Sequence, residues 1–117
     1  MGTFSWPVQI QSLEGGPTLQ IEAMVDTGAS YTMLPSDVLR ELGITATRLG
    51  VFELADNRMV EMSMADVWAT IDGKSTTTIV LFGEEGTPPL LGAYTLEGLL
   101  LAVDPVNERL VPTHGIL

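Results

Sequence analysis

The residue best placed for chemistry is Asp26, which follows a stretch of alternating polar and apolar residues. In residues 19–25 the apolar odd-numbered positions would face one side of a β-strand, and the even-numbered positions would face the other. The chain then enters the small residues 27–30, whose glycine permits a tight turn. A strand that leads into such a loop can hold one carboxylate rigidly enough for acid–base chemistry.

The loop sequence Asp-Thr-Gly-Ala-Ser, residues 26–30, resembles the active-site loop of aspartic proteases, and the short chain is similar to their retropepsin-like branch. Downstream, residues 90–92 (Leu-Leu-Gly) resemble the hydrophobic-hydrophobic-glycine motif that packs behind this loop in the family. The resemblance covers most of the chain and implies an all-β fold. We therefore expect a closed acid-protease β-barrel with a flap hairpin and one or two short helices, in a single domain spanning residues 1–117. The alternative is that Asp26 only stabilises a turn, as aspartate often does.

The family resemblance also implies a role for each matching position. The catalytic residue would be Asp26, with Thr27 bracing two such loops across a dimer and Gly28 allowing the substrate backbone to approach. The substrate-binding positions would be Ala29, Ser30, Ala55, Asp56, Asn57, Arg58 and Met59, and the loop would be supported by Leu90, Leu91 and Gly92. Retroviral enzymes carry aspartate where this chain has Ser30.

Hydrolysis of a peptide bond without a metal or a covalent nucleophile needs both a base and an acid. Two adjacent carboxylates that share one proton can fill both roles, because like charges push their pKa values apart. This chain offers one Asp-Thr-Gly loop, and its other aspartates lie in different sequence contexts. We therefore expect the second carboxylate to be Asp26 of a second copy, related by a two-fold axis, and the monomer to be inactive.

Composition narrows the range of partners. The chain has 15 acidic and 5 basic residues, for a net charge of −10, which argues against nucleic acid or an anionic membrane as a partner and favours a peptide or protein substrate. It has no cysteine and one histidine, His114, so we expect no metal site and no cofactor. The N-terminus lacks the features of a secretory signal, and the longest apolar run is too short to span a bilayer. We expect a cytoplasmic protein.

Several elements are needed to position the loop. Residues 3–12 should form a hairpin with the strand that ends at Asp26, and residues 31–34 should form a short strand. A short helix should follow, with Ser36 as its N-cap and Gly43 just after its end. Residues 49–55 and 59–71 read as a long hairpin with residues 56–58 at its tip, and by resemblance this hairpin is the flap that closes over a bound peptide.

The rest of the chain reads as further strands around a second short helix. The pair Asp72-Gly73 should turn the chain into a strand over residues 76–82. A helix over residues 91–98, ended by Gly98, should lead into a buried strand at residues 99–103. A turn at residues 104–108 should then lead into residues 109–111. In retroviral relatives the chain termini pair across the dimer, and the sequence leaves open whether they do so here.

Two further hypotheses follow. The flap tip has no glycine, unlike retroviral flaps, so the rival to a protease is a catalytically silent retropepsin-fold module that dimerises or binds peptide.

The strong negative charge also opposes association of two copies. Dimerisation and activity should therefore increase as the pH falls.

Overall fold

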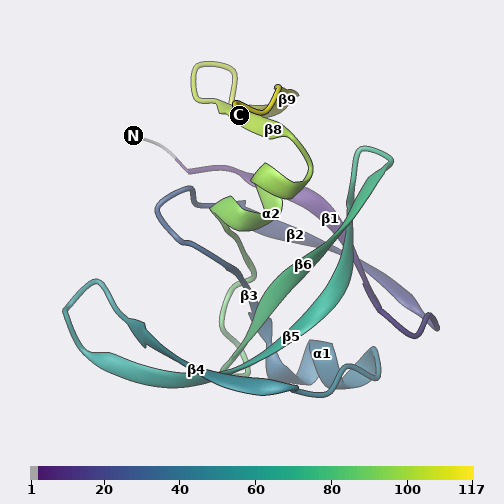
Figure 1. Ribbon diagram of the computed structural model, residues 1–117, viewed down its shortest axis with the longest axis vertical. Helices are drawn as coiled ribbons and strands as arrows, with labels where there is room; N and C mark the ends of the chain where they lie inside the picture. The colour runs from purple at the N-terminus through teal and green to yellow at the C-terminus, as the bar shows by residue number, and fades with distance from the viewer. Residues whose placement is uncertain (1–2) are drawn as a thin grey trace.

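The computed structural model describes residues 3–117, which form a ring of strands with two short helices (Figure 1). Seven strands form one mixed sheet, in the order β1 (Ser5–Ser12), β2 (Thr18–Val25), β7 (Leu90–Leu91), β3 (Thr32–Pro35), β6 (Lys74–Gly83), β5 (Met59–Ile71) and β4 (Arg48–Glu53). An additional pairing of β1 with β5 closes this sheet into a ring, from which β4 extends. The predicted mostly-β fold, a closed ring with two short helices, is confirmed.

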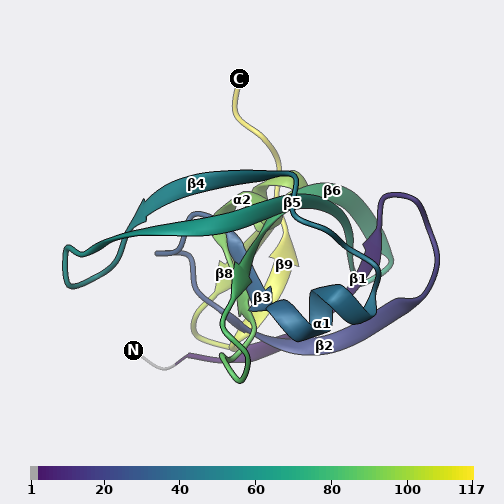
Figure 2. The ribbon, with the colours of Figure 1, turned by 90° about the horizontal axis from the view of Figure 1, so that it is seen from below.

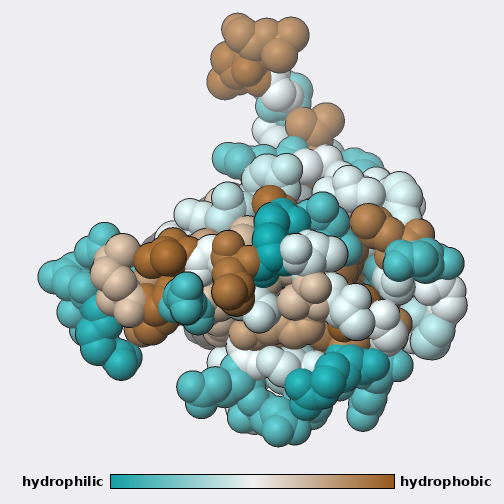
Figure 3. All heavy atoms as spheres, turned by 60° about the horizontal axis from the view of Figure 1, so that its bottom comes forward, coloured by the Kyte–Doolittle hydropathy of each residue, from teal (hydrophilic) through white to brown (hydrophobic). Residues whose placement is uncertain are grey.

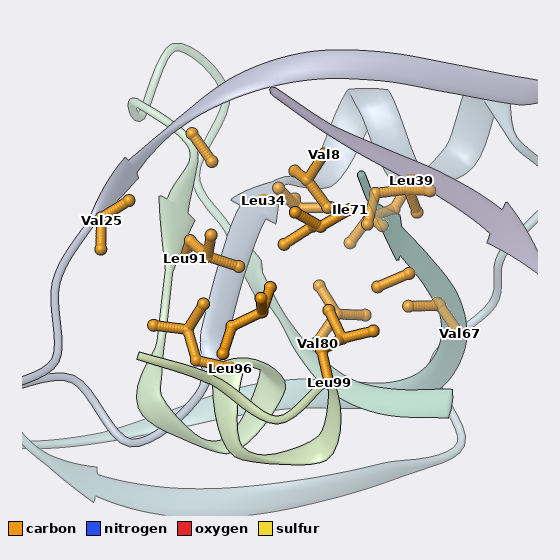
Figure 4. Close-up of a cluster of buried hydrophobic side chains, with 14 of the residues drawn as sticks. Val8, Val25, Leu34, Leu39, Val67, Ile71, Val80, Leu91, Leu96 and Leu99 are labelled. Carbon is orange, nitrogen blue, oxygen red and sulfur yellow. The ribbon is translucent and has the colours of Figure 1, made fainter. Parts of the chain in front are cut away.

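The core fills the inside of this ring. Every second residue of β1 from Val8 onward is buried, as the alternating pattern requires. Side chains from β5, β6 and both helices meet them in one cluster (Figure 4). The largest fully buried apolar side chains are Val8, Ile10, Leu34, Leu39, Val67, Ile71, Val80 and Leu91. The ring therefore forms a packed frame for the loop between β2 and β3, which carries Asp26.

The first helix, α1 (Ser36–Glu41), starts one position earlier than the sequence suggested. Its N-cap is Pro35, and Ser36 is the first helical residue, so the prediction of Ser36 as the N-cap is wrong. The Ser36 hydroxyl instead donates to the carbonyl oxygen of Gly83 at 2.5 Å, and it thereby ties the helix to the end of β6. Gly43 follows the helix with a φ of 75°, which confirms the expected glycine stop.

The second helix, α2 (Ala93–Gly98), leads into a separate two-stranded sheet of β8 (Leu101–Asp104) and β9 (Arg109–Pro112). The helix ends at Gly98 as predicted, with Leu99 as its C-cap, and Leu100 then takes the left-handed φ of 54°. Its predicted start at residue 91 is wrong, because Leu91 belongs to β7 and the helix begins at Ala93. Residues 99 and 100 form a turn, so the next strand starts at Leu101, two residues later than predicted.

The flap is the ribbon formed by β4, β5 and the turn between them. It projects from the ring in two perpendicular views (Figures 1 and 2). At its tip the Asn57 N–H donates to the Leu54 carbonyl oxygen, and Asn57 adopts a φ of 69°, which confirms the predicted tight turn. Brown apolar side chains lie along the flap at the left of Figure 3. Leu49, Val51 and Met59 are each more than 60% exposed. Among residues 3–117, no helix is long and apolar enough to cross a membrane.

Candidate active site

Asp26 lies at the point where β2 ends, and its own backbone and side chain shape the loop that follows. Its N–H donates to the Leu91 carbonyl oxygen at 3.0 Å, which anchors the loop to β7. Its Oδ1 accepts a hydrogen bond from the Gly28 N–H at 3.0 Å, and its carbonyl oxygen accepts one from the Ala29 N–H at 3.2 Å. The contact with Gly28 is the turn-stabilising one that aspartate commonly makes, and it also orients the half-buried carboxylate.

The Leu90-Leu91-Gly92 segment lies directly beside the loop. Strand β7 pairs in parallel with the end of β2, with Leu90 opposite Met24 and Leu91 opposite Val25. The first two N–H groups of α2 donate to loop carbonyls, Ala93 to Ala29 at 2.8 Å and Tyr94 to Ser30 at 2.9 Å. The loop is therefore held from two sides, by a strand and by a helix N-terminus.

Gly92 is required at this contact. A Cβ atom added to Gly92 would lie 2.5 Å from both the carbonyl carbon and the carbonyl oxygen of Tyr31, closer than real Cβ atoms approach backbone. The Gly92 N–H donates to Thr32 Oγ1 at 3.1 Å in the same buried place. A side chain here would push the active-site loop away from α2.

Beneath the loop lies a group of three buried hydroxyls, the threonine trio of Thr32, Thr78 and Thr95. Thr95 Oγ1 lies 2.6 Å from Thr32 Oγ1 and 2.8 Å from Thr78 Oγ1, and all three residues are at most 2% exposed. The trio links β3, β6 and α2 close to the loop that carries Asp26. Sequence analysis missed the trio, because Thr32 and Thr78 are ordinary strand residues, Thr95 lies in a helix, and no local pattern marks the three as partners.

A second link joins the loop to the flap. The ring of Tyr31 meets the ring of Phe52, on β4, edge to face with centroids 6.0 Å apart. The other neighbour of Tyr31 is Tyr94 of α2, at 5.7 Å. Such edge-to-face pairs add a modest attraction beyond the apolar area that they bury. The β4 arm of the flap therefore contacts Tyr31, the residue that follows the loop of residues 26–30.

A largely apolar cleft of about 250 Å³ lies between the loop and the flap. Its lining includes Gly28, Ala29 and Ser30 from the loop, together with Leu90 from β7. The flap contributes Phe52, Glu53, Leu54 and Met62. The predicted flap contacts, residues 55–59, do not line this cleft and lie exposed beyond it. Of the predicted substrate-binding residues, the structure therefore places Ala29 and Ser30 in this cleft. On the flap side the cleft is lined by residues 52–54 and 62 instead of the predicted residues 55–59.

Asp26 and Thr27 themselves line a different cavity, of about 170 Å³. The rest of its wall comes from the start of the described chain, Thr3 and Phe4, and from Val103 and Pro105 of the β8–β9 hairpin. Within residues 3–117, no group of three or more metal-ligating side chains could hold an ion. The chemistry that this site offers is that of a carboxylate.

Comparison with known proteins agrees with the geometry. Residues 6–93 match the family model described as aspartyl protease, and the chain therefore belongs to that family. Among solved structures, it is similar to the solution structure of simian foamy virus (mac) protease, with a TM-score of 0.56 and 14% sequence identity. The match covers 80% of this chain and 91% of that chain, which shows a shared retropepsin-like fold. A search of curated proteins finds no match.

Proposed function

We propose that this protein is an aspartic endopeptidase that acts as a homodimer, with one Asp26 from each subunit and residues 1–117 as a single domain. The observation that carries the proposal is the anchoring of Asp26, whose backbone is fixed by β7 and whose carboxylate is oriented by Gly28. A reactive carboxylate needs such a rigid frame, because small misplacements lower the rate strongly.

The proposed chemistry uses two carboxylates and one water. One Asp26 carboxylate accepts a proton from the water as the water attacks the peptide carbonyl carbon, and its protonated mate donates its proton to the carbonyl oxygen. When the tetrahedral intermediate collapses, the C–N bond breaks, and the proton taken from the water passes to the nitrogen of the leaving amine. Two carboxylates at short range cannot both be ionised easily, so sharing one proton prepares the pair for both roles. In a dimer, Thr27 would brace the loops, and Gly28 would leave room for the peptide backbone.

A peptide substrate would bind extended in the cleft between the loop and the flap. Ala29 and Ser30 already line this cleft, and residues 55–59 would contact the peptide from above once the flap closes. The apolar lining from Leu90, Phe52 and Met62 suits an apolar substrate side chain.

The rival function is a silent module that dimerises or binds peptide without turnover. It is supported by the flap tip, residues 56–58, which has no glycine to make it mobile, and by Ser30, which stands where retroviral enzymes have aspartate. Both functions use the same fold, so only a measurement of cleavage separates them.

The test is cleavage of a mixed peptide library by the wild type and by Asp26→Asn. The matched control is Asp72→Asn, which removes the same charge at an exposed turn where asparagine tolerates the φ of 50°. We expect Asp26→Asn to lower the rate by roughly 10³-fold or more and Asp72→Asn to leave it unchanged. Inhibition by pepstatin would support the same mechanism. Equally low cleavage by all three proteins, with peptide binding retained, would favour the silent module.

Association should also depend on pH. Two chains of net charge −10 repel each other at neutral pH, and protonation of carboxylates relieves that repulsion. We expect a larger dimer fraction at pH 5 than at pH 7.5 in sedimentation experiments. The same fraction at both values would contradict this expectation.

A further inference from the structure

We propose that the substrate cleft continues into a second recess, which binds an apolar side chain of the same polypeptide at a distance from the bond to be cleaved. This accessory recess is a hollow of about 390 Å³ whose lining includes Leu13, Arg48, Asp66, Thr77, Ile79 and Tyr94. The proposal rests on the proposed function, because it extends the site that would hold the substrate. It assigns a binding site outside the cleft, which a short peptide would leave empty.

The cleft and the recess lie on one face of the sheet, where residues two positions apart in a strand point the same way. On β6, Leu81 lines the cleft and Ile79 lines the recess. On β4, Phe52 lines the cleft and Arg48 lines the recess. Between them, Met64 of β5 is opposite Arg48 on one side and Leu81 on the other. The three strands therefore carry one continuous face from the cleft to the recess.

Aromatic rings form the boundary between the two hollows. Tyr31 lines the cleft, and its ring meets that of Tyr94, which lines the recess, with centroids 5.7 Å apart. The ring of Phe52 meets Tyr31 from the flap side. This ring folds back along β4, so its Cε2 atom lies 2.8 Å from the place where a Cβ atom of Gly50 would be. A peptide that leaves the cleft along this face crosses these rings and then reaches the recess.

The lining of the recess suits an apolar side chain on a polar backbone. Leu13 and Tyr94 are 45% and 47% exposed, and Ile79 is half-buried, so an apolar group bound among them would remove apolar surface from water. Arg48 Nη2 lies 3.2 Å from Asp66 Oδ1, and both side chains are exposed. Because these charges are already paired, they do not select a charged ligand. Their remaining donors and acceptors can serve the peptide backbone.

Continuity with the cleft identifies the occupant as the substrate chain itself. A segment tethered by a peptide in the cleft meets the recess at a high effective concentration, so a weak apolar contact there still adds to affinity. In the proposed two-fold dimer the recess occurs twice, once in each chain. Either end of a bound peptide could therefore carry the apolar residue.

The test measures binding to the Asp26→Asn protein by fluorescence anisotropy, so that no probe is cleaved. The short probe is a labelled peptide from the mixed library. Longer probes extend it at either end with serine and glycine and place one phenylalanine at successive positions, and their controls carry serine instead. We expect the best phenylalanine probe to bind roughly tenfold more tightly than its serine control, because an aromatic side chain becomes buried.

A substitution in the recess should remove this gain. Added to the Asp26→Asn protein, Leu13→Asp should bring the phenylalanine probe close to its serine control. The matched control is Leu49→Asp, because Leu49 is an exposed leucine of β4 that points to the opposite face from Arg48. It should retain the tenfold gain. In NMR spectra the amide signals of Thr77 and Ile79 should shift with the phenylalanine probe and not with the serine probe.

Circular dichroism checks that each variant is folded, and Leu13→Ser replaces Leu13→Asp if the charged variant does not fold. Equal binding of the phenylalanine and serine probes, or a gain that substitution of Leu13 leaves intact, would overturn the recess. A wild type that cleaves no peptide, with the gain preserved in the Asp26→Asn protein, would remove the protease and support the recess. If no library peptide is bound or cleaved, the recess and the proposed function are both wrong.

Discussion

The loop that carries Asp26, residues 26–30, and the flap tip both connect strands of one sheet, yet they are held in different ways. The loop that carries Asp26 is fixed by contacts distant in sequence, from Leu91 and from the N-terminus of α2, and the threonine trio joins α2 to β3 and β6. The flap tip is held by contacts within five residues, chiefly the hydrogen bonds among Leu54, Asn57 and Arg58.

This difference in contacts fits the different tasks that we propose for the loop and the flap. A loop that positions a reactive carboxylate benefits from buried, long-range contacts, because they set its geometry before any substrate binds. A flap that covers substrates benefits from few tertiary contacts, because it can then move without unfolding the ring. Tyr31 and Phe52 connect the two regions through one edge-to-face contact. The comparison predicts that substitutions beneath the loop should be costly and that those at the flap tip should be nearly silent.

The largest effect is expected at Gly92. Replacing Gly92 with alanine places a Cβ atom 2.5 Å from the Tyr31 backbone, so the loop or α2 must move. We expect a loss of about 3 kcal/mol in the free energy of unfolding, measured by chemical denaturation, together with loss of activity. The control is Gly115→Ala, where the added atom would lie 3.9 Å from the Leu100 side chain. Equal stability of the two variants would contradict the proposed close approach.

A smaller effect is expected in the threonine trio. Thr95→Val keeps the shape of the side chain but removes the hydroxyl that lies between those of Thr32 and Thr78. We expect a loss of roughly 1–3 kcal/mol in the free energy of unfolding, because two buried hydroxyls lose a partner. Thr77→Val is the control, since Thr77 is exposed on the same strand as Thr78. If both variants unfold at the same denaturant concentration, the trio does not brace the loop.

The smallest effect is expected at the flap tip, where the Arg58 Nε lies 2.7 Å from Asp56 Oδ2 and both side chains are exposed. The side-chain hydrogen bond from Arg58 is the main cause that lowers the pKa of Asp56. Because a lowered pKa favours the charged form, this pairing is present above the ordinary pKa and is lost as the pH falls through the lowered value. Arg58→Ala should raise the pKa of Asp56 in an NMR titration and leave the melting temperature unchanged. A clear drop in melting temperature would mean that the tip is part of the cooperative fold.

The sequence predicted those features that local chemistry determines. The Asp72-Gly73 turn, the asparagine at the flap tip and the alternation along β2 are all local signals, and the structure confirms each of them. The predicted neighbours of Asp26 came instead from a family resemblance, and Leu91 does lie against it.

The features that the sequence did not predict depend on contacts between residues far apart in the chain or on packing. Thr32 and Thr95 are 63 residues apart, and no periodic pattern connects them. The Ser36 hydroxyl was expected to cap a helix because capping is a local preference, but the carbonyl of Gly83 provides a partner 47 residues away. Leu100 takes a left-handed φ that favours glycine, because the chain must turn there from α2 into β8. In each case a distant contact or a packing constraint overrides a local preference.

The central claim is that each chain supplies half of the active site, and the dependence of cleavage rate on protein concentration tests it most directly. When most of the protein is monomeric, the initial rate should rise with the square of the chain concentration, because only the dimer is active. It should become proportional to concentration once sedimentation shows that the dimer predominates. A rate that is proportional to concentration while the protein sediments as a monomer would contradict the account.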